Sequence, residues 1–178
     1  TDKDTTNKTT FIFKWDTLYN ADDYRVDIWT PIFNSGQKIL SIVTTSDTFK
    51  YTLAEGIYEW GIRGQNNLTN TPFSKRSLFI DTTNPNTPSL LAPANNASMN
   101  DSIISFSWSR GIITGSTIKD SLYIYSDSLM TSIKISKYVS ETSYSDSLGV
   151  GTFFWRVRSI DAASNYSNYS VLRKLTLQ

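Results

Sequence analysis

The sequence predicts an all-β chain that folds as two tandem β-sandwiches. Hydrophobic and polar residues alternate along most of its 178 residues, and helical spacing of the hydrophobic residues is hard to find. The phrase GIYEWGIR at 56–63 recurs as GTFFWRVR at 151–158. The repeated unit is close to the ~100 residues of one seven-stranded sandwich, so each copy is expected to be a domain.

Five segments of the first copy have the alternation of a β-strand. They cover 10–15, 23–29, 49–53, 56–63 and 77–80. In the repeated phrase Tyr58, Trp60 and Ile62 share the inward face, so Trp60 is expected to fill the core. Turns rich in Asn, Gly, Ser and Pro separate the segments, as in a sandwich.

The second copy repeats these segments at 104–108, 121–126, 143–148, 151–158 and 173–177. It also has a short opening strand around Leu90 and Leu91, which stops at Pro93. The first copy has only the polar segment TDKDTTNKTT ahead of Phe11. Either upstream residues supply its first strand or this polar segment takes the strand's place, and we favour a truncated first copy.

The segment DTTNPNTP at 81–88 separates the copies. Pro85 and Pro88 cannot donate hydrogen bonds to a sheet ladder, so we expect a short and fairly stiff linker. The predicted organisation is a sandwich at 1–81, a linker at 82–88 and a second sandwich at 89–178.

The composition excludes several classes of protein. The formal net charge of +1 argues against a nucleic-acid partner, and no segment approaches the ~18 consecutive apolar residues of a membrane span. The chain has no Cys and no His, which removes disulfides, thiolate metal sites and the commonest general base. We therefore expect no metal and no cofactor.

Motifs of both copies point to one known family. Trp15 and Trp108 lie on the second strand, and the pattern Leu-x-x-Gly-x-aromatic-x-Trp-x-Val/Ile-Arg covers the sixth. The second copy adds IDAASNYSNYS at 160–170 before its last strand. These motifs resemble fibronectin type III modules of bacterial surface proteins, and the resemblance implies two tandem fibronectin type III-like β-sandwiches. It also implies that Tyr58 is the family's corner tyrosine, whereas the second copy has Phe153.

Few side chains are available for catalysis. Asp22, Asp23 and Asp120 are expected in loops before the third strand of their copies, and Asp161 in the turn before the last strand. Asp at such places more often accepts hydrogen bonds from turn backbone, and no calcium-binding run of acidic residues occurs. We therefore predict no catalytic residue and no enzymatic activity.

An aromatic surface is the candidate binding site. It consists of Tyr123, Tyr125, Phe154, Arg156 and Arg158 on the outer face of two neighbouring strands. Aromatic rings beside arginines can stack on a sugar or a partner surface, but cross-strand packing is the alternative and contributes roughly 0.2–1 kcal/mol per pair. In the first copy Trp29, at a strand end, is the corresponding candidate.

The tripeptide Asp–Ser/Thr–small or aliphatic recurs along the chain. It resembles the O-glycosylation acceptor that one group of Gram-negative bacteria uses on exported proteins. The candidate acceptors are Thr5, Thr17, Thr82, Ser102, Ser121, Ser128 and Ser147. Asp-Ser and Asp-Thr pairs that simply start strands and turns are the alternative.

Together these patterns predict a non-catalytic spacer and interaction module of a larger exported protein, on the exterior of a bacterial outer membrane and in the manner of a surface lipoprotein. The alternative is a glycan- or protein-binding module that uses the aromatic face of the second copy. The expected partners are other domains of the same parent protein, and a glycan or surface protein.

Overall fold

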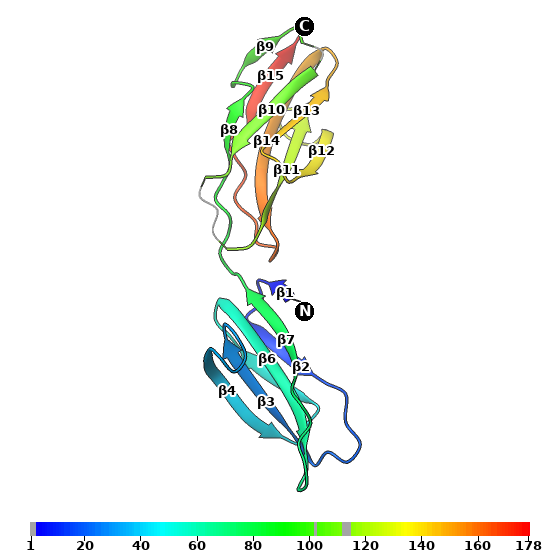
Figure 1. Cartoon of the computed structure of the whole chain (residues 1–178). Coiled ribbons are helices and arrows are strands. Elements are labelled where there is room, and N and C mark those ends of the chain that lie inside the picture. Colours follow the sequence, from blue (N-terminus) through cyan, green and yellow to red (C-terminus); the bar gives the residue numbers. More distant parts are fainter. Residues whose placement is uncertain (1–2, 102, 112–114) are drawn as a thin grey trace. The chain divides into compact units, whose positions relative to one another are not determined.

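The computed structural model describes residues 3–101, 103–111 and 115–178, and every regular element within them is a β-strand (Figure 1). The chain divides into two compact units, Thr1–Thr82 and Thr83–Gln178. Each unit builds its own hydrophobic cluster between a larger and a smaller sheet. The predicted all-β sandwich architecture is confirmed.

Unit 1 contains seven strands within its described residues. They are β1 (Lys3–Thr6), β2 (Thr10–Lys14), β3 (Asp23–Thr30), β4 (Gln37–Thr44), β5 (Thr48–Thr52), β6 (Gly56–Gln65) and β7 (Ser74–Ile80). The larger sheet has the order β1-β7-β6-β3-β4, and the smaller one pairs β2 with β5. All neighbours are antiparallel except β1, which runs parallel to β7.

The described residues of unit 2 repeat this topology with one more strand. Its strands are β8 (Ser89–Ala92), β9 (Ala97–Met99), β10 (Ile103–Ser109), β11 (Ile118–Tyr125), β12 (Ile133–Val139), β13 (Ser143–Ser147), β14 (Gly151–Asp161) and β15 (Arg173–Leu177). The larger sheet has the order β12-β11-β14-β15-β9, and the smaller one β13-β10-β8. The parallel pair β9–β15 corresponds to β1–β7.

Three of these strands, β4, β9 and β12, are absent from the sequence-based prediction. Each lies at the edge of its larger sheet and pairs with one strand there: β4 with β3, β9 with β15 and β12 with β11. Most side chains of β12 are exposed, and none on β4 is fully buried. An edge strand has one neighbour and buries few side chains, so its hydrophobic alternation is weak.

The polar segment at the start of the chain does form a strand. Asp4 of β1 lies beside Leu78 of β7, just as Ala97 of β9 lies beside Leu175 of β15. The polar segment is thus the counterpart of β9 and not of β8. Among the described residues of unit 1, no strand pairs with β2 on the side where β8 pairs with β10.

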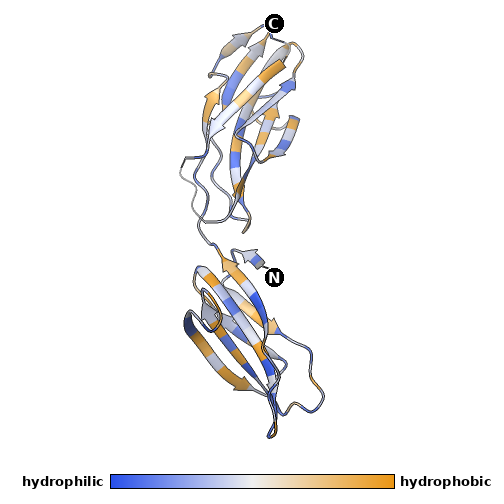
Figure 2. Ribbon diagram, in the orientation of Figure 1, coloured by the Kyte–Doolittle hydropathy of each residue, from blue (hydrophilic) through white to orange (hydrophobic). Residues whose placement is uncertain are grey.

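The two repeated tryptophans differ in burial. Trp155 is 0% exposed, with its ring packed edge-on against Phe106 at 5.1 Å between centroids. Trp60 packs against Phe13 at 4.9 Å but is only half-buried and borders a groove. Both tryptophans thus pack inward as predicted, but Trp60 lies at the margin of its core, because no described strand covers that side of unit 1. Figure 2 shows the alternating hydropathy of the strands in both units.

The repeated phrase is explained by its backbone. Gly56 and Gly151 have φ of +155° and +153°, a region that side chains strongly disfavour. The aromatic ring two residues later folds back over each glycine. In unit 1 that residue is Tyr58, whose hydroxyl donates to Ala54 O at 3.1 Å, and burial raises the pKa of this phenol. The corner-tyrosine prediction agrees with this contact.

Candidate binding surfaces

The aromatic face predicted on unit 2 is present, but its rings already pack on one another. Strand register places Tyr123 opposite Arg156 and Tyr125 opposite Phe154. The Tyr123 and Tyr125 rings stack with centroids 6.3 Å apart. Tyr125 is only 3% exposed, and its hydroxyl accepts a hydrogen bond from Arg156 Nη2 at 3.1 Å. It therefore presents almost no free surface.

Two tyrosines of the segment before β15 complete this cluster. The Tyr169 ring meets Tyr123 edge-on at 5.9 Å and lies 3.8 Å from the Arg156 guanidinium carbon. The guanidinium of Arg158 lies over Tyr166 at 4.3 Å and over Tyr169 at 4.9 Å. We call these six residues the arginine–tyrosine ladder: Tyr123, Tyr125, Arg156, Arg158, Tyr166 and Tyr169.

Hydroxyl groups hold the covering segment in place. The amide of Val157 donates to Ser170 Oγ at 3.0 Å, and that of Ser159 donates to Ser167 Oγ at 2.8 Å. These bonds continue the pairing along β14 past Trp155, where the pairing with the first residue of β15, Arg173, stops. Burial raises the pKa of the Tyr169 phenol, although Arg158 acts in the opposite direction. The sequence pattern NYSNYS at 165–170 reflects this arrangement: its serines point inward and its tyrosines lie over the arginines.

Phe154, a member of the predicted site, is half-buried. Tyr166, which the prediction did not include, is 45% exposed. Ring–ring and cation–π contacts each contribute roughly 0.5–1.5 kcal/mol, so six clustered groups stabilise unit 2 appreciably. The structure therefore supports cross-strand packing as the main role of this face.

Trp29 of unit 1 lies in a comparable cluster. Lys38 Nζ is 4.8 Å from its ring centroid, and the Phe33 ring is 5.9 Å away. Phe33 in turn meets Phe73 edge-on at 5.0 Å. Phe33 is 4% exposed and lies on Gly61, where a Cβ atom would come within 2.7 Å of its ring. Glycine is required at position 61 for this close approach.

A buried carboxylate lies on the same outer face. Asp27 is 2% exposed and receives Arg25 Nε at 3.0 Å, Ser41 Oγ at 2.7 Å and Lys38 Nζ at 3.3 Å. Burial by itself raises the pKa of Asp27, but the three donors outweigh it and hold the pKa below its usual value. This group stabilises the sheet and is not free for chemistry.

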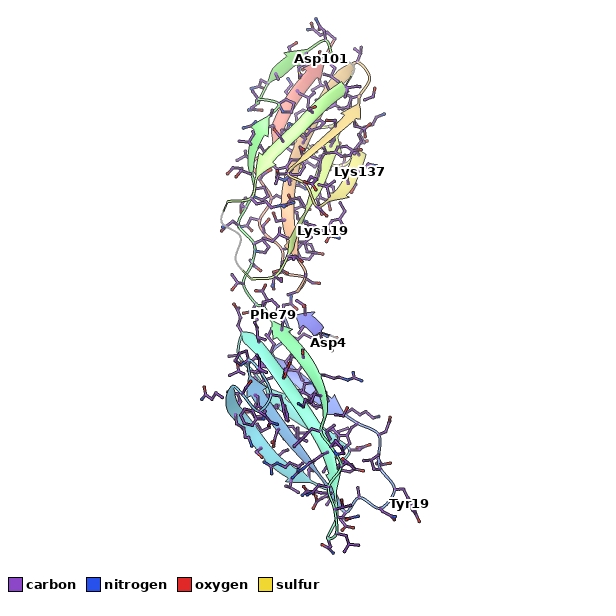
Figure 3. The ribbon with its side chains drawn as sticks, viewed as in Figure 1. Asp4, Tyr19, Phe79, Asp101, Lys119 and Lys137 are labelled. Carbon is purple, nitrogen blue, oxygen red and sulfur yellow. The ribbon has the colours of Figure 1, made fainter. Side chains whose placement is uncertain are left out.

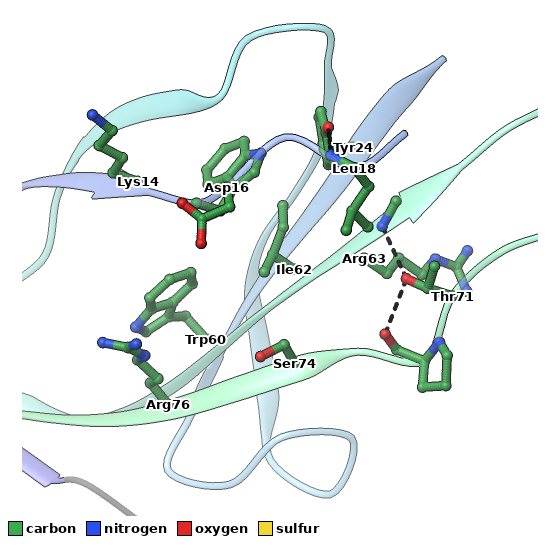
Figure 4. Close-up of a pocket in the computed structure, with 13 residues that line it drawn as sticks. Lys14, Asp16, Leu18, Tyr24, Trp60, Ile62, Arg63, Thr71, Ser74 and Arg76 are labelled. Carbon is green, nitrogen blue, oxygen red and sulfur yellow. Dashed lines mark hydrogen bonds between the residues drawn. The ribbon is translucent and has the colours of Figure 1, made fainter. Parts of the chain in front are cut away.

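Unit 1 has an open groove between β2 and β7 (Figure 4). One part, about 550 Å³, is lined by Lys14, Trp15, Asp16, Trp60 and Arg76 among others. A second part of about 510 Å³ shares Lys14, Trp60 and Arg76 and continues towards β1. This groove was not predicted from the sequence, because it lies along an edge of β2 that no described strand covers.

Of the acidic residues weighed as catalytic groups, Asp120 and Asp161 have structural partners. Asp23 is the first residue of β3 and does not lie in a loop as predicted, and its Oδ1 is buried without a hydrogen-bond partner among the described residues. Asp120 lies inside β11 and not in a loop as predicted, and it is 0% exposed. It accepts hydrogen bonds from Trp108 Nε1 at 2.5 Å, Ser159 Oγ at 2.6 Å and Arg110 Nε at 2.7 Å. Asp161 accepts from the amide and side chain of Asn165, as expected of a turn cap.

The candidate glycosylation sites differ in exposure. Thr17, Thr82, Ser128 and Ser147 are exposed, while Thr5 and Ser121 are half-buried within strands. Ser102 lies outside the described residues. Asp127, which precedes Ser128, accepts the amides of Thr131 and Ser132, and the Ser132 bond chiefly lowers the Asp127 pKa. That geometry is the turn-capping alternative.

Two loops of unit 1 expose large hydrophobic side chains that the prediction overlooked. Tyr19, which points away from the sheets in Figure 3, is 96% exposed, and Leu68 is 94% exposed. The loops meet where Asn66 Nδ2 donates to Asn20 O at 2.8 Å. Loops of this kind often carry binding residues in sandwich folds.

Across the described ranges no group of three or more acidic side chains is arranged to hold a metal ion. The same residues contain no helix long and apolar enough to cross a membrane.

Comparison with known proteins identifies the fold. No family model matches the sequence, and no curated protein matches it either. The FN1–FN3 domains of chicken CNTN1 align over 99% of this chain with a TM-score of 0.52 and 15% identity, and the chain spans 65% of that structure's length. The fibronectin(III)-like modules of Clostridium thermocellum CbhA align over 99% of this chain and 89% of theirs, with a TM-score of 0.55 and 15% identity. The chain therefore has the fold of tandem fibronectin type III-like β-sandwiches, as the sequence predicts.

Proposed function

We propose that this chain is a non-catalytic structural and interaction module of a larger exported, cell-surface protein, in which it supports neighbouring domains. A fibronectin type III-like fold is in keeping with a structural or interaction role. The fold alone names no ligand, so the proposal rests on how the side chains are used.

The observation that carries this proposal is the arginine–tyrosine ladder. The groups best suited to bind a sugar or a partner on unit 2 are instead stacked on each other, with Tyr125 3% exposed. Asp27 and Asp120, two of the buried carboxylates, are each satisfied by three donors. Such an arrangement favours rigidity over turnover.

A double variant, Tyr123→Ala/Tyr125→Ala, tests this proposal. Removing a buried aromatic ring costs about 3–5 kcal/mol, and each kcal/mol lowers the melting temperature by roughly 4–8 °C in a domain of this size. We expect calorimetry of the full chain to show unit 2 melting more than ~10 °C lower. The matched control Tyr19→Ala removes a ring that is 96% exposed and should change the melting temperature little.

The same double variant distinguishes the alternative, a glycan- or protein-binding module. If the face binds a polysaccharide, the variant should lose retention on a polysaccharide affinity gel while its melting temperature stays nearly unchanged. The exposed part of Tyr166 is the feature that favours this second function.

Export to the bacterial cell surface and O-glycosylation are part of the proposal. The exposure of Thr17, Thr82, Ser128 and Ser147 supports them as acceptors. Mass spectrometry of protein from its native host should find added mass on peptides that contain these residues. Unmodified peptides at all four sites would remove the support that glycosylation gives to export.

A further inference from the structure

The outermost strand of the larger sheet in unit 1 has an edge that no described strand covers. β4 pairs with β3 and ends the sheet order on that side (Figure 1). In an antiparallel ladder every second residue directs its N–H and C=O groups away from its neighbour. The eight residues of β4 therefore present a row of backbone donors and acceptors to which a further strand can pair.

The residues along this edge favour such pairing. From Ile39 to Ser46 the sequence reads ILSIVTTS, which contains no charged residue, no proline and no glycine. Most of these residues are β-branched, and a segment of this kind has a high tendency to add to another strand. Val43 is 58% exposed, and no side chain of β4 is fully buried. Hydrophobic surface thus lies at the edge itself.

The corresponding edge strand of unit 2 has a different character. β12 ends its sheet in the same way, but its exposed side chains include Lys134 and Lys137. Lysine on an edge strand opposes the approach of another strand, because its charge would lose water. The one lysine of β4, Lys38, lies near the start of the strand and binds the buried carboxylate of Asp27 at 3.3 Å. The edge of β4 therefore lacks the protection that β12 carries.

We propose that β4 is a self-association edge, to which a second copy of this chain adds its own β4 in antiparallel orientation. The two five-stranded sheets then continue into each other across a two-fold axis. Such a pairing is closed, because each copy uses its free β4 edge in the contact, so a dimer forms and not a fibre.

The charge pattern of β4 favours a second copy as the occupant. A two-fold axis through Ser41 places Lys38 opposite Thr44 of the second copy, and an axis through Ile42 places it opposite Ser46. No like charges meet in either register, and aliphatic side chains lie opposite aliphatic ones across most of the pair. The second copy also brings a strand of equal length.

The contact is small, since each copy contributes one strand of eight residues. We therefore expect a weak dimer, with a Kd on the order of 100 μM. This association goes beyond the structural role proposed above and does not depend on it.

The test is sedimentation equilibrium of the full chain from about 10 μM to about 1 mM, with hydrogen exchange measured at both ends of that range. We expect a monomer–dimer equilibrium, and the amides of 39–44 should gain protection as the concentration rises. Val43→Lys should weaken association about tenfold or more, because it places a lysine from each copy at the shared edge. Ile133→Lys is the matched control, since Ile133 is 56% exposed on β12, and it should leave the association unchanged.

Other outcomes overturn the proposal. They are a monomer at every concentration, association that Val43→Lys leaves unchanged, an equal loss in Ile133→Lys, or protection that rises only in strands other than β4. Calorimetry at low concentration, where the chain is monomeric, verifies that Val43→Lys remains folded. The concentration-dependent protection of 39–44 in the unchanged chain tests the proposal independently of this variant.

Discussion

Asp120 forms the polar centre of unit 2, and its replacement by alanine is expected to destabilise that unit by about 3–5 kcal/mol. Three donors converge on this fully buried carboxylate: Trp108 Nε1, Ser159 Oγ and Arg110 Nε, at 2.5 to 2.7 Å. Removing the carboxylate leaves the Arg110 side chain, which is 12% exposed, without its counter-charge. The loss is a large fraction of the ~5–15 kcal/mol that stabilises a typical domain.

The assay is urea unfolding of the full chain, followed by tryptophan fluorescence and far-ultraviolet circular dichroism. Asp120→Ala should move the transition of unit 2 and leave that of unit 1 in place. The double variant Arg110→Ala/Asp120→Ala should cost less than the sum of the two single variants, because it leaves no unpaired buried charge. Asp101→Ala, in an exposed loop position, is the control and should change stability by less than about 0.5 kcal/mol.

A cost below about 1 kcal/mol for Asp120→Ala would refute the reasoning. So would strict additivity in the double variant, because it would mean that Arg110 and Asp120 do not depend on each other.

Three further predictions concern single groups. The folded-state pKa of Asp27 lies below its usual value. The stability that the Asp27 carboxylate contributes is therefore complete above the unfolded pKa of ~3.9 and is lost as pH falls through the folded pKa. Asp27→Asn should flatten the acid limb of the curve of unfolding free energy against pH for unit 1. Tyr144 donates a hydrogen bond to Asp146 at 2.6 Å, and this bond raises the Tyr144 pKa to about 12. An ultraviolet titration should find one tyrosine ionising near that pH, and Asp146→Asn should return its pKa towards 10. An unchanged titration of the variant would contradict the contact. The stability that this bond contributes is present below pH ~10 and lost as pH rises towards 12. Gly151→Ala should cost roughly 1–3 kcal/mol, measured by denaturant unfolding, because φ of +153° strains any side chain there; a neutral effect would contradict that backbone geometry.

The repeated phrase was readable from the sequence because its causes are local. A glycine at φ near +150° and the aromatic ring that folds over it are neighbours in the chain, and inward alternation follows from the period of a strand. The core position of Trp155 and the hydrogen bond of Tyr58 could therefore be anticipated.

The burial of Tyr125 and the partners of Asp120 could not be predicted in this way. Tyr125 is covered through Arg156 and the segment that carries Tyr169, which lies more than forty positions along the chain. Asp120 is placed in a strand by its two neighbours, although its own residue type disfavours strands.

The sequence by itself determined the all-β class, the twofold repeat and which side chains of each strand face inward, because these depend on patterns along the chain. Only the tertiary structure decided which inward-facing aromatic side chains are fully buried and which stay partly exposed. That outcome depends on which strand lies beside which. In unit 2, β8 covers Trp108 and Trp155, while in the described part of unit 1 no strand covers Trp15 and Trp60. Neighbour relations of this kind join residues far apart in the chain, and no local pattern encodes them.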